Sequence, residues 1–176
     1  WLQPFDAYAT HSMQDAGRYA PRALYCPNAA RESVYRVSAD ELAALRDPAR
    51  YRWDVSFVGN LDAVRYREHV RRVEFLLDLE ARLGALGIST HFRDSAGLSG
   101  DEQLAVIRQS RINLSTVAGC DAGAEASWGL PERCYGVPAC GGFLLSDRRR
   151  HAAEDFAEDE RAEYDGIEDC TRKIRY

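Results

Sequence analysis

"GLPERCYGVPACGGFLLSD", residues 129–147, predicts a short helix that leads into a strand. Pro131 suits the first turn of a helix, because the amide hydrogen that proline lacks has no helical partner in that turn. Gly141 and Gly142 predict the end of the helix and the entry into the strand. The segment is therefore one helix–strand unit of an α/β protein.

Strands and helices alternate on both sides of this segment. "WDVSFVGN", residues 53–60, is typical of a buried strand and its turn, and residues 67–87 place leucines and valines at helical spacing. Further strands are predicted at 88–94, 111–117, 141–146 and 161–166, and further helices at 99–110 (with Ser99 as N-cap), 130–137, 151–158 and 167–176. This alternation with short linkers predicts a Rossmann-like parallel sheet with helices on both faces.

Residues 1–50 are organised less regularly. Short strands are predicted in "FDAYATHS" (5–12) and "RALYCPNAA" (22–30), and a capped helix in "SADELAALRDPARY" (38–51) that stops near Pro48. The chain begins at Trp1 and closes inside a predicted helix, so we expect it to be a piece of a longer protein.

Composition excludes several classes of protein. The chain has 176 residues, enough for one full domain, and a net charge of −5, which argues against a general nucleic-acid binder. Its five cysteines are scattered without a C-x-x-C pair, so neither a disulfide framework nor a zinc site is expected. With no apolar run long enough to span a membrane and no signal sequence, the expected location is cytoplasmic.

Candidate ligand-binding residues follow the first strong strand. In an open parallel sheet, ligands bind outside the carboxyl ends of the strands. Gly59 and Asn60 lie in the turn after residues 53–58, and Arg65 follows a little later. A glycine lets backbone amides approach a phosphate, and an arginine offers a planar fork to its oxygens. The simpler alternative is that Gly59 only makes the turn.

Residues 129–147 supply a second group of candidate ligand-binding residues. Gly129 and Pro131 start a helix whose free amides point at the same edge of the sheet, where they attract anions. Arg133, in the first turn, is well placed to grip a diphosphate, although a surface salt bridge is the simpler role. Asp147 follows a strand at this edge, and an N-cap for the next turn is its simpler account.

The motifs resemble a known family of enzymes. "WDVSFVGN", "RINLS" and above all "LPERCYGVPACGGFLLSD", with "FAEDE" and "IEDCTRKIRY" after it, are similar to the carboxyl-terminal domain of CgeB-like glycosyltransferases, which have the two-domain GT-B architecture. The resemblance covers roughly residues 53–176 and is most specific from Arg133 to Asp147. It implies that residues 51–176 hold a nucleotide-diphosphate sugar. Residues 1–50 would be the end of an amino-terminal domain, the rest of which is missing, and the crossover between the domains.

The resemblance also implies a mechanism and a set of site residues. The sugar passes to an unidentified acceptor in the cleft between the domains, without a metal or other cofactor. Arg133 is the predicted catalytic residue, together with His11, which ends a strand facing the cleft. The residues predicted to bind the donor are Gly59, Asn60, Arg65, Gly129, Leu130, Pro131, Glu132, Arg133 and Gly136. Arg133→Ala is expected to weaken diphosphate binding with little change in stability.

One position departs from the family pattern. Related enzymes carry a glutamate, expected to bind the ribose hydroxyls, where this chain has Gly136, and Glu132 lies one helical turn earlier. Glycine inside a helix costs about 1 kcal/mol relative to alanine, so we hypothesise that the missing side chain leaves space at the nucleotide site. The lost glutamate also agrees with an alternative function, a non-catalytic Rossmann-like scaffold or partner-binding module.

Overall fold

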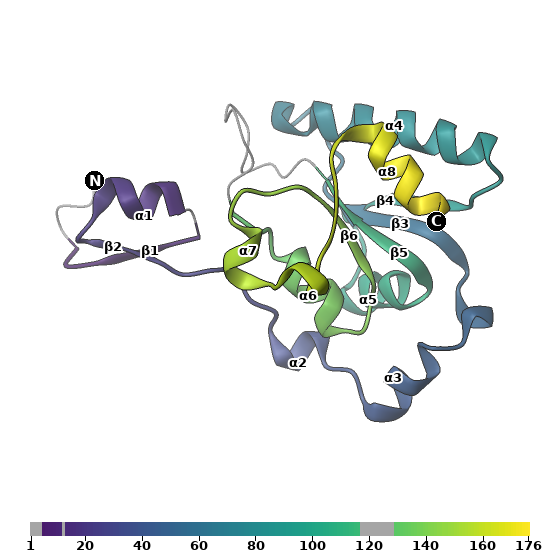
Figure 1. Cartoon of the computed structure of the whole chain (residues 1–176), viewed down its shortest axis with the longest axis horizontal. Coiled ribbons are helices and arrows are strands. Elements are labelled where there is room, and N and C mark those ends of the chain that lie inside the picture. The colour runs from purple at the N-terminus through teal and green to yellow at the C-terminus, as the bar shows by residue number, and fades with distance from the viewer. Residues whose placement is uncertain (1–4, 12, 117–128) are drawn as a thin grey trace.

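The computed structural model describes residues 5–11, 13–116 and 129–176. Its main feature is a five-stranded parallel sheet with the order β4-β3-β5-β6-β7 (Figure 1). The strands are β3 (Trp53–Gly59), β4 (Thr90–Asp94), β5 (Ser110–Ser115), β6 (Leu144–Asp147) and β7 (Ala162–Tyr164). Every neighbouring pair is parallel. The predicted α/β class and Rossmann-like sheet are confirmed.

Helices cover both faces of this sheet (Figure 1). One face packs against α4 (Val70–Ala85) and α8 (Gly166–Arg175), and the other against α5 (Gly100–Arg108) and α6 (Arg133–Ala139). The main core lies on the first face, where the leucines of α4 meet Val55, Phe57, Leu114 and Leu145. Each of these four strand residues is at most 2% exposed.

The helix boundaries follow from local sequence signals. Ser99 caps α5 as predicted, and its hydroxyl accepts a hydrogen bond from the Glu102 amide in a capping box. Ser38 caps α3 (Ala39–Ala44) in the same way, and this helix is shorter than predicted, because Pro48 begins a separate 3₁₀ turn (Pro48–Arg50). Further short elements are a 3₁₀ turn at Arg67–His69, α7 (Ala152–Asp155) and a 3₁₀ turn at Glu158–Glu160.

The helix predicted at residues 130–137 begins three residues later than expected, at Arg133. Cys134 N–H donates to Pro131 O over 2.9 Å, which makes a tight turn leading into α6 at Arg133. Gly141 ends the unit with φ of +82°, a conformation that glycine adopts without strain. The helix–glycine–strand order of residues 129–147 is thus confirmed.

A small unit precedes the main domain. Strands β1 (Tyr8–Thr10) and β2 (Ala23–Tyr25) pair in parallel and are joined by α1 (Met13–Tyr19), a helix that the sequence did not predict (Figure 1). Helix α2 (Glu32–Tyr35), also not predicted, lies in the connection to the main domain and contacts α6. The Tyr25 hydroxyl links the small unit to α7 by donating to Asp155 over 3.0 Å.

Candidate functional site

The strand order makes the carboxyl ends of β3 and β5 the candidate binding site. From β3 the chain crosses to β4 on one side and then to β5 on the other, so the connections diverge between β3 and β5. Ligands of open parallel sheets bind in the crevice at such a switch point. A cavity of about 430 Å³ lies there, lined by β3, β5, α5, α6 and the connection around α2.

Two arginines meet at this cavity from helices on opposite faces of the sheet. The guanidinium of Arg133 on α6 lies 4.3 Å from the centre of the Phe57 ring, and that of Arg72 on α4 lies 5.8 Å from it. Glu132 is the one carboxylate among the described residues that line the cavity. The site therefore carries concentrated positive charge, which suits a ligand with two or more negative charges.

Arg133 is held firmly by the sheet itself. Its Nη1 donates to Leu114 O over 3.0 Å and its Nη2 donates to Val58 O, so α6 is fastened to the ends of both strands. Although the residue as a whole is half-buried, burial of its guanidinium, with the nearby Arg72 charge, lowers the pKa of Arg133 to about 10. Arg133 is therefore still a cation at neutral pH, and part of its hydrogen-bonding capacity is already used.

Gly59 makes room for this arginine. A Cβ atom at this position would lie 2.7 Å from Arg133 Nη2 and 2.9 Å from the Phe57 ring. Because Arg133 is fixed by two carbonyl groups, it cannot move aside without losing them. The predicted turn glycine thus has a packing role beside the cavity, and any direct contact with a ligand stays a prediction.

The next predicted residues lie at different distances from the cavity. Asn60 is not among the lining residues, but its carbonyl accepts a hydrogen bond of 2.8 Å from Nη1 of Arg72, which does line the cavity. Arg65 is exposed, its guanidinium lies over the Tyr66 ring, and it is not among the lining residues. Arg72 was missed by sequence reasoning. The available signal was its place in the first turn of α4, a helix that begins at the edge of the sheet where β3 ends.

The structure corrects the hypothesis about Gly136. A Cβ atom there would lie 2.7 Å from two ring carbons of Tyr35, so the notch above the glycine is filled by a phenol rather than left open. Gly136, Pro131 and Glu132 all line the cavity, as does Tyr35 itself. Glycine at 136 is thus required by close packing between α6 and the preceding connection.

Gly129, Leu130 and His11 are brought together beside the cavity. A Cβ atom at Gly129 would lie 2.5 Å from His11 O, so these two residues are in contact. The carbonyl of Leu130 accepts a hydrogen bond of 2.8 Å from Asn28 Nδ2. None of the three lines the cavity, although Asn28 does. The predicted residues therefore divide into a group at the cavity and a group at its margin.

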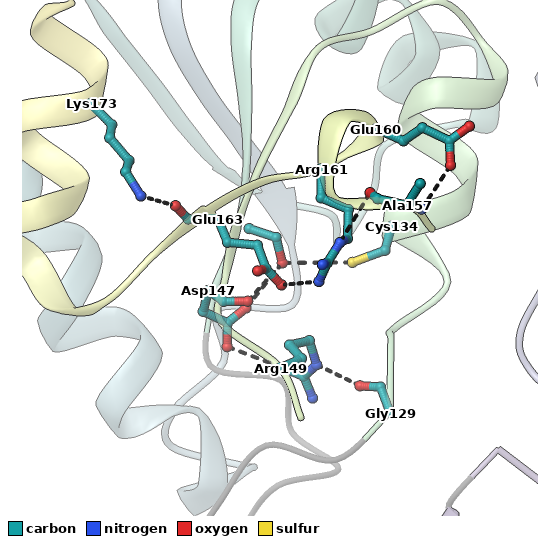
Figure 2. Close-up of polar contacts among 10 residues, drawn as sticks. Gly129, Cys134, Asp147, Arg149, Ala157, Glu160, Arg161, Glu163 and Lys173 are labelled. Carbon is teal, nitrogen blue, oxygen red and sulfur yellow. Dashed lines mark hydrogen bonds and ion pairs between the residues drawn. The ribbon is translucent and has the colours of Figure 1, made fainter. Parts of the chain in front are cut away.

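Asp147 does not cap the next turn as predicted. Figure 2 shows it paired with Arg149, whose Nη1 lies 3.0 Å from Asp147 Oδ2 and whose Nε donates to Gly129 O. Arg149 is only 3% exposed, and the N-cap of α7 is His151. Since a buried charge needs a partner, the ion pair has priority over a cap. Through its second hydrogen bond, Arg149 anchors the backbone at Gly129.

A second cavity lies away from the switch point. It has a volume of about 380 Å³ and a mainly apolar lining that includes Cys134 and Phe156. Cys134 Sγ lies 3.8 Å from the hydroxyl of Ser146 in β6, and an ion pair of 3.2 Å between Arg161 and Glu163 lies at the edge of the cavity (Figure 2). Burial raises the pKa of the Cys134 thiol, which is therefore not a ready nucleophile. The first cavity is the better candidate for a negatively charged ligand.

Residues 5–11, 13–116 and 129–176 lack both a metal-binding cluster and a membrane-spanning helix. This part of the chain contains no group of three or more His, Cys, Asp or Glu side chains that could hold a metal ion. None of its helices has the length and apolar character needed to cross a membrane. Cys26, Cys134, Cys140 and Cys170 are free thiols, and Cys120 lies outside the described residues.

A known protein family matches most of this chain. A family model described as "Glycosyl transferase-like" matches residues 36–176, which include all five strands of the main sheet and both arginines of the cavity. A search of curated proteins found no match. The family match begins just after Tyr35, so two residues that line the cavity, Asn28 and Tyr35, lie outside it.

Proposed function

This chain belongs to the glycosyl transferase-like family, and we propose that it binds a nucleotide-diphosphate sugar at the carboxyl ends of β3 and β5. The sugar is transferred to an acceptor that the residues of the site do not identify. The observation that carries the proposal is the meeting of Arg72 and Arg133 over Phe57, beside a cavity at the switch point of the sheet. Within the family, the motifs of residues 129–147 favour a CgeB-like enzyme.

The chemistry follows from this charge distribution. Departure of a nucleoside diphosphate leaves negative charge on its phosphate oxygens, and fixed cations in a water-poor site stabilise that charge. Arg133 is held in place by two carbonyl groups before any ligand arrives, so little reorganisation is needed. Arg72 supplies the second cation from the opposite face. His11, which contacts Gly129, stays a predicted catalytic residue on the acceptor side.

We also propose the division of the chain into a donor-binding domain at residues 51–176 and a remnant of a second domain at residues 1–50. Support comes from the β1–α1–β2 unit, whose two strands are parallel. Parallel sheets are normally larger and covered on both faces, whereas Leu24 in β2 is 61% exposed. A partner domain that completes this sheet and supplies the acceptor site would account for both features.

The direct test is calorimetric titration of the chain with uridine and guanosine diphosphates. We expect binding of at least one of them, and a ligand at 100 times its dissociation constant would add about 2.7 kcal/mol to the stability. Arg72→Gln should weaken binding by about 1.5 to 3 kcal/mol, the usual value of a hydrogen bond to a charged group. Arg65→Gln tests whether the exposed arginine predicted from sequence contributes.

The matched control is Arg111→Gln, because Arg111 lies near the amino end of β5 and its side chain is 58% exposed. This variant should bind like the unaltered chain. If no nucleotide binds and none raises the melting temperature, the non-catalytic scaffold is the better reading. If binding occurs but is insensitive to Arg72, the diphosphate site lies elsewhere.

A further inference from the structure

The second cavity lies beside the connection between β6 and β7. In this connection α7 has four residues and is followed by a 3₁₀ turn of three, so the sheet next to α6 is covered only by short elements. The cavity has a volume of about 380 Å³. Pockets that bind small molecules usually measure about 300 to 1,000 Å³. Helix α6 contributes Cys134 and Pro138 to this cavity and a different set of residues, which includes Arg133, to the first.

The lining of the second cavity is mainly apolar. Its apolar side chains include Leu130, Phe143, Leu144, Ala152 and Phe156. An apolar cavity of about 150 Å³ is large enough to bind benzene, because water does not fill such a space. The second cavity therefore suits the apolar body of a ligand, such as an aromatic ring.

The wall that α7 forms is fixed before any ligand arrives. Asp155 Oδ2 accepts a hydrogen bond of 2.7 Å from the Tyr135 hydroxyl and one of 3.0 Å from the Tyr25 hydroxyl. The rings of Tyr135 and Phe156 also lie against each other, with their centres 5.4 Å apart. Because the wall is already ordered, binding of a small rigid ligand carries little further cost in conformational entropy.

The rim of the second cavity is acidic. Asp159, Glu160 and Glu163 border it, and Arg161 is the one cation among the described residues that line it. Arg161 forms its ion pair with Glu163, and these side chains are only 18% and 21% exposed (Figure 2). Glu160 is held at the rim by a hydrogen bond of 2.8 Å from the Ala157 amide. Since Arg161 and Glu163 neutralise each other, the carboxylates of Asp159 and Glu160 give the rim its negative charge.

We propose that the second cavity binds a small organic amine with an apolar body. The apolar body packs against Phe143, Leu144 and Phe156, and the ammonium group lies at the rim with Asp159 and Glu160. Two carboxylates attract an ammonium group and repel a carboxylate or a phosphate, so this cavity has the opposite charge preference to the first. The site is separate from the proposed nucleotide site and needs no nucleotide.

Three probes of nearly the same shape test this charge preference: benzylamine, benzyl alcohol and benzoate. In NMR titrations of the whole chain, binding should be saturable, tightest for benzylamine and weakest for benzoate. We expect benzylamine to bind at least about fivefold more tightly than benzoate, the effect of one close pair of charges in water. Absence of saturable binding, or benzoate binding as tightly as benzylamine, would overturn the proposal.

Two neighbouring leucines locate the bound probe without any substitution. Leu144 lines the second cavity, whereas Leu145 is 2% exposed in the core on the other face of the sheet. Nuclear Overhauser effects from the benzylamine ring should therefore reach the Leu144 methyl groups and not those of Leu145. Contacts that exclude Leu144 would place the binding site elsewhere and overturn the proposal.

Asp159→Asn tests the acidic rim. Asp159 is exposed, so the fold should tolerate the change. The variant should bind benzylamine about twofold to fivefold more weakly, the usual effect of losing an exposed ion pair, and benzyl alcohol as before. The matched control is Glu158→Gln, in the same 3₁₀ turn and outside the lining, which should bind all three probes like the unaltered chain. Equal effects of the two substitutions on benzylamine binding would contradict a specific rim contact.

Discussion

The two faces of the central sheet are built from different kinds of residue, although their side chains alternate along the same strands. The face toward α4 and α8 carries Val55, Phe57, Leu114 and Leu145, all buried in one apolar core. The face toward α5 and α6 carries small polar side chains, namely Ser56, Asn113, Ser115 and Ser146, which are also buried. One face is packed like a protein interior, and the other is held by hydrogen bonds.

This difference explains where the cavities lie. Short polar side chains leave space that a covering helix does not fill, and both cavities border the polar face, one at Ser56 and Asn113 and one at Ser146. Buried polar groups need partners, and Asn113 has them in Ser56 and in the carbonyl of Ile107. The apolar face thus stabilises the domain, whereas the polar face leaves room for a ligand.

The sharpest test of this comparison uses two neighbouring leucines of β6. Leu145 is 2% exposed in the apolar core, whereas Leu144 borders the second cavity on the other face. Leu145→Ala should lower the free energy of unfolding by about 2 to 5 kcal/mol, because the packed site cannot collapse around the lost atoms. Leu144→Ala should cost clearly less. Urea denaturation of both variants gives the two values, and equal costs would contradict the comparison.

Arg133→Ala should have the next largest effect. It removes a cation that fastens α6 to both strands and leaves the carbonyls of Val58 and Leu114 without these donors. We expect a loss of about 1.5 to 3 kcal/mol in denaturation, the usual value of a hydrogen bond involving a charged group. This replaces the expectation from sequence that stability would barely change. Arg111→Ala, at an exposed arginine, is the control and should stay within about 0.5 kcal/mol.

Asn113→Ala tests the hydrogen-bonded face directly. The Asn113 amide donates to Ile107 O over 3.1 Å and accepts from the Ser56 hydroxyl over 3.0 Å. Its removal should cost about 1 to 3 kcal/mol in chemical denaturation, because partners on both sides lose a hydrogen bond. Ser56→Ala breaks only one of these bonds and should cost less. Should Asn113→Ala prove neutral, the polar face contributes nothing to stability.

The smallest effect is expected at the surface of α8, on the apolar side. Asp169 accepts a hydrogen bond from the Asp165 amide and pairs with Lys173 and Arg172, which together lower the pKa of Asp169 to about 2. A carboxylate with a lowered folded pKa stabilises the protein above its unfolded pKa and loses that contribution as the pH falls toward 2. Asp169→Asn should therefore lower the melting temperature slightly at pH 7.

Thermal melts from pH 7 down to pH 3 would follow this contribution. The difference between Asp169→Asn and the unaltered chain should narrow below about pH 4, near the ordinary pKa of an aspartate. Added salt should also reduce it, since exposed charges are screened. A difference that is independent of pH would mean that the asparagine acts through packing rather than charge.

Local patterns were sufficient for most of the main domain. The strand at 53–60 and the helix within 67–87 were predicted because their apolar residues recur at strand and helix spacing over long segments. Ser99 was predicted as a cap because its pattern is local. Helices α1 and α2 were missed because segments of seven and four residues are too short to show a period. The donor-site residues were predicted from the carboxyl ends of the expected strands and from the resemblance to the family.

Spacing in the chain thus determined an alternating α/β domain and the position of Arg133 at the carboxyl edge of its sheet, beside the candidate site. Only the tertiary structure decided which residues meet at this edge: Arg72 lies with Arg133 over Phe57, and Tyr35 packs against Gly136. The members of each pair are far apart in the chain and belong to different elements. Their contact depends on how the helices pack on the sheet, and side-chain spacing within one element holds no information about that packing.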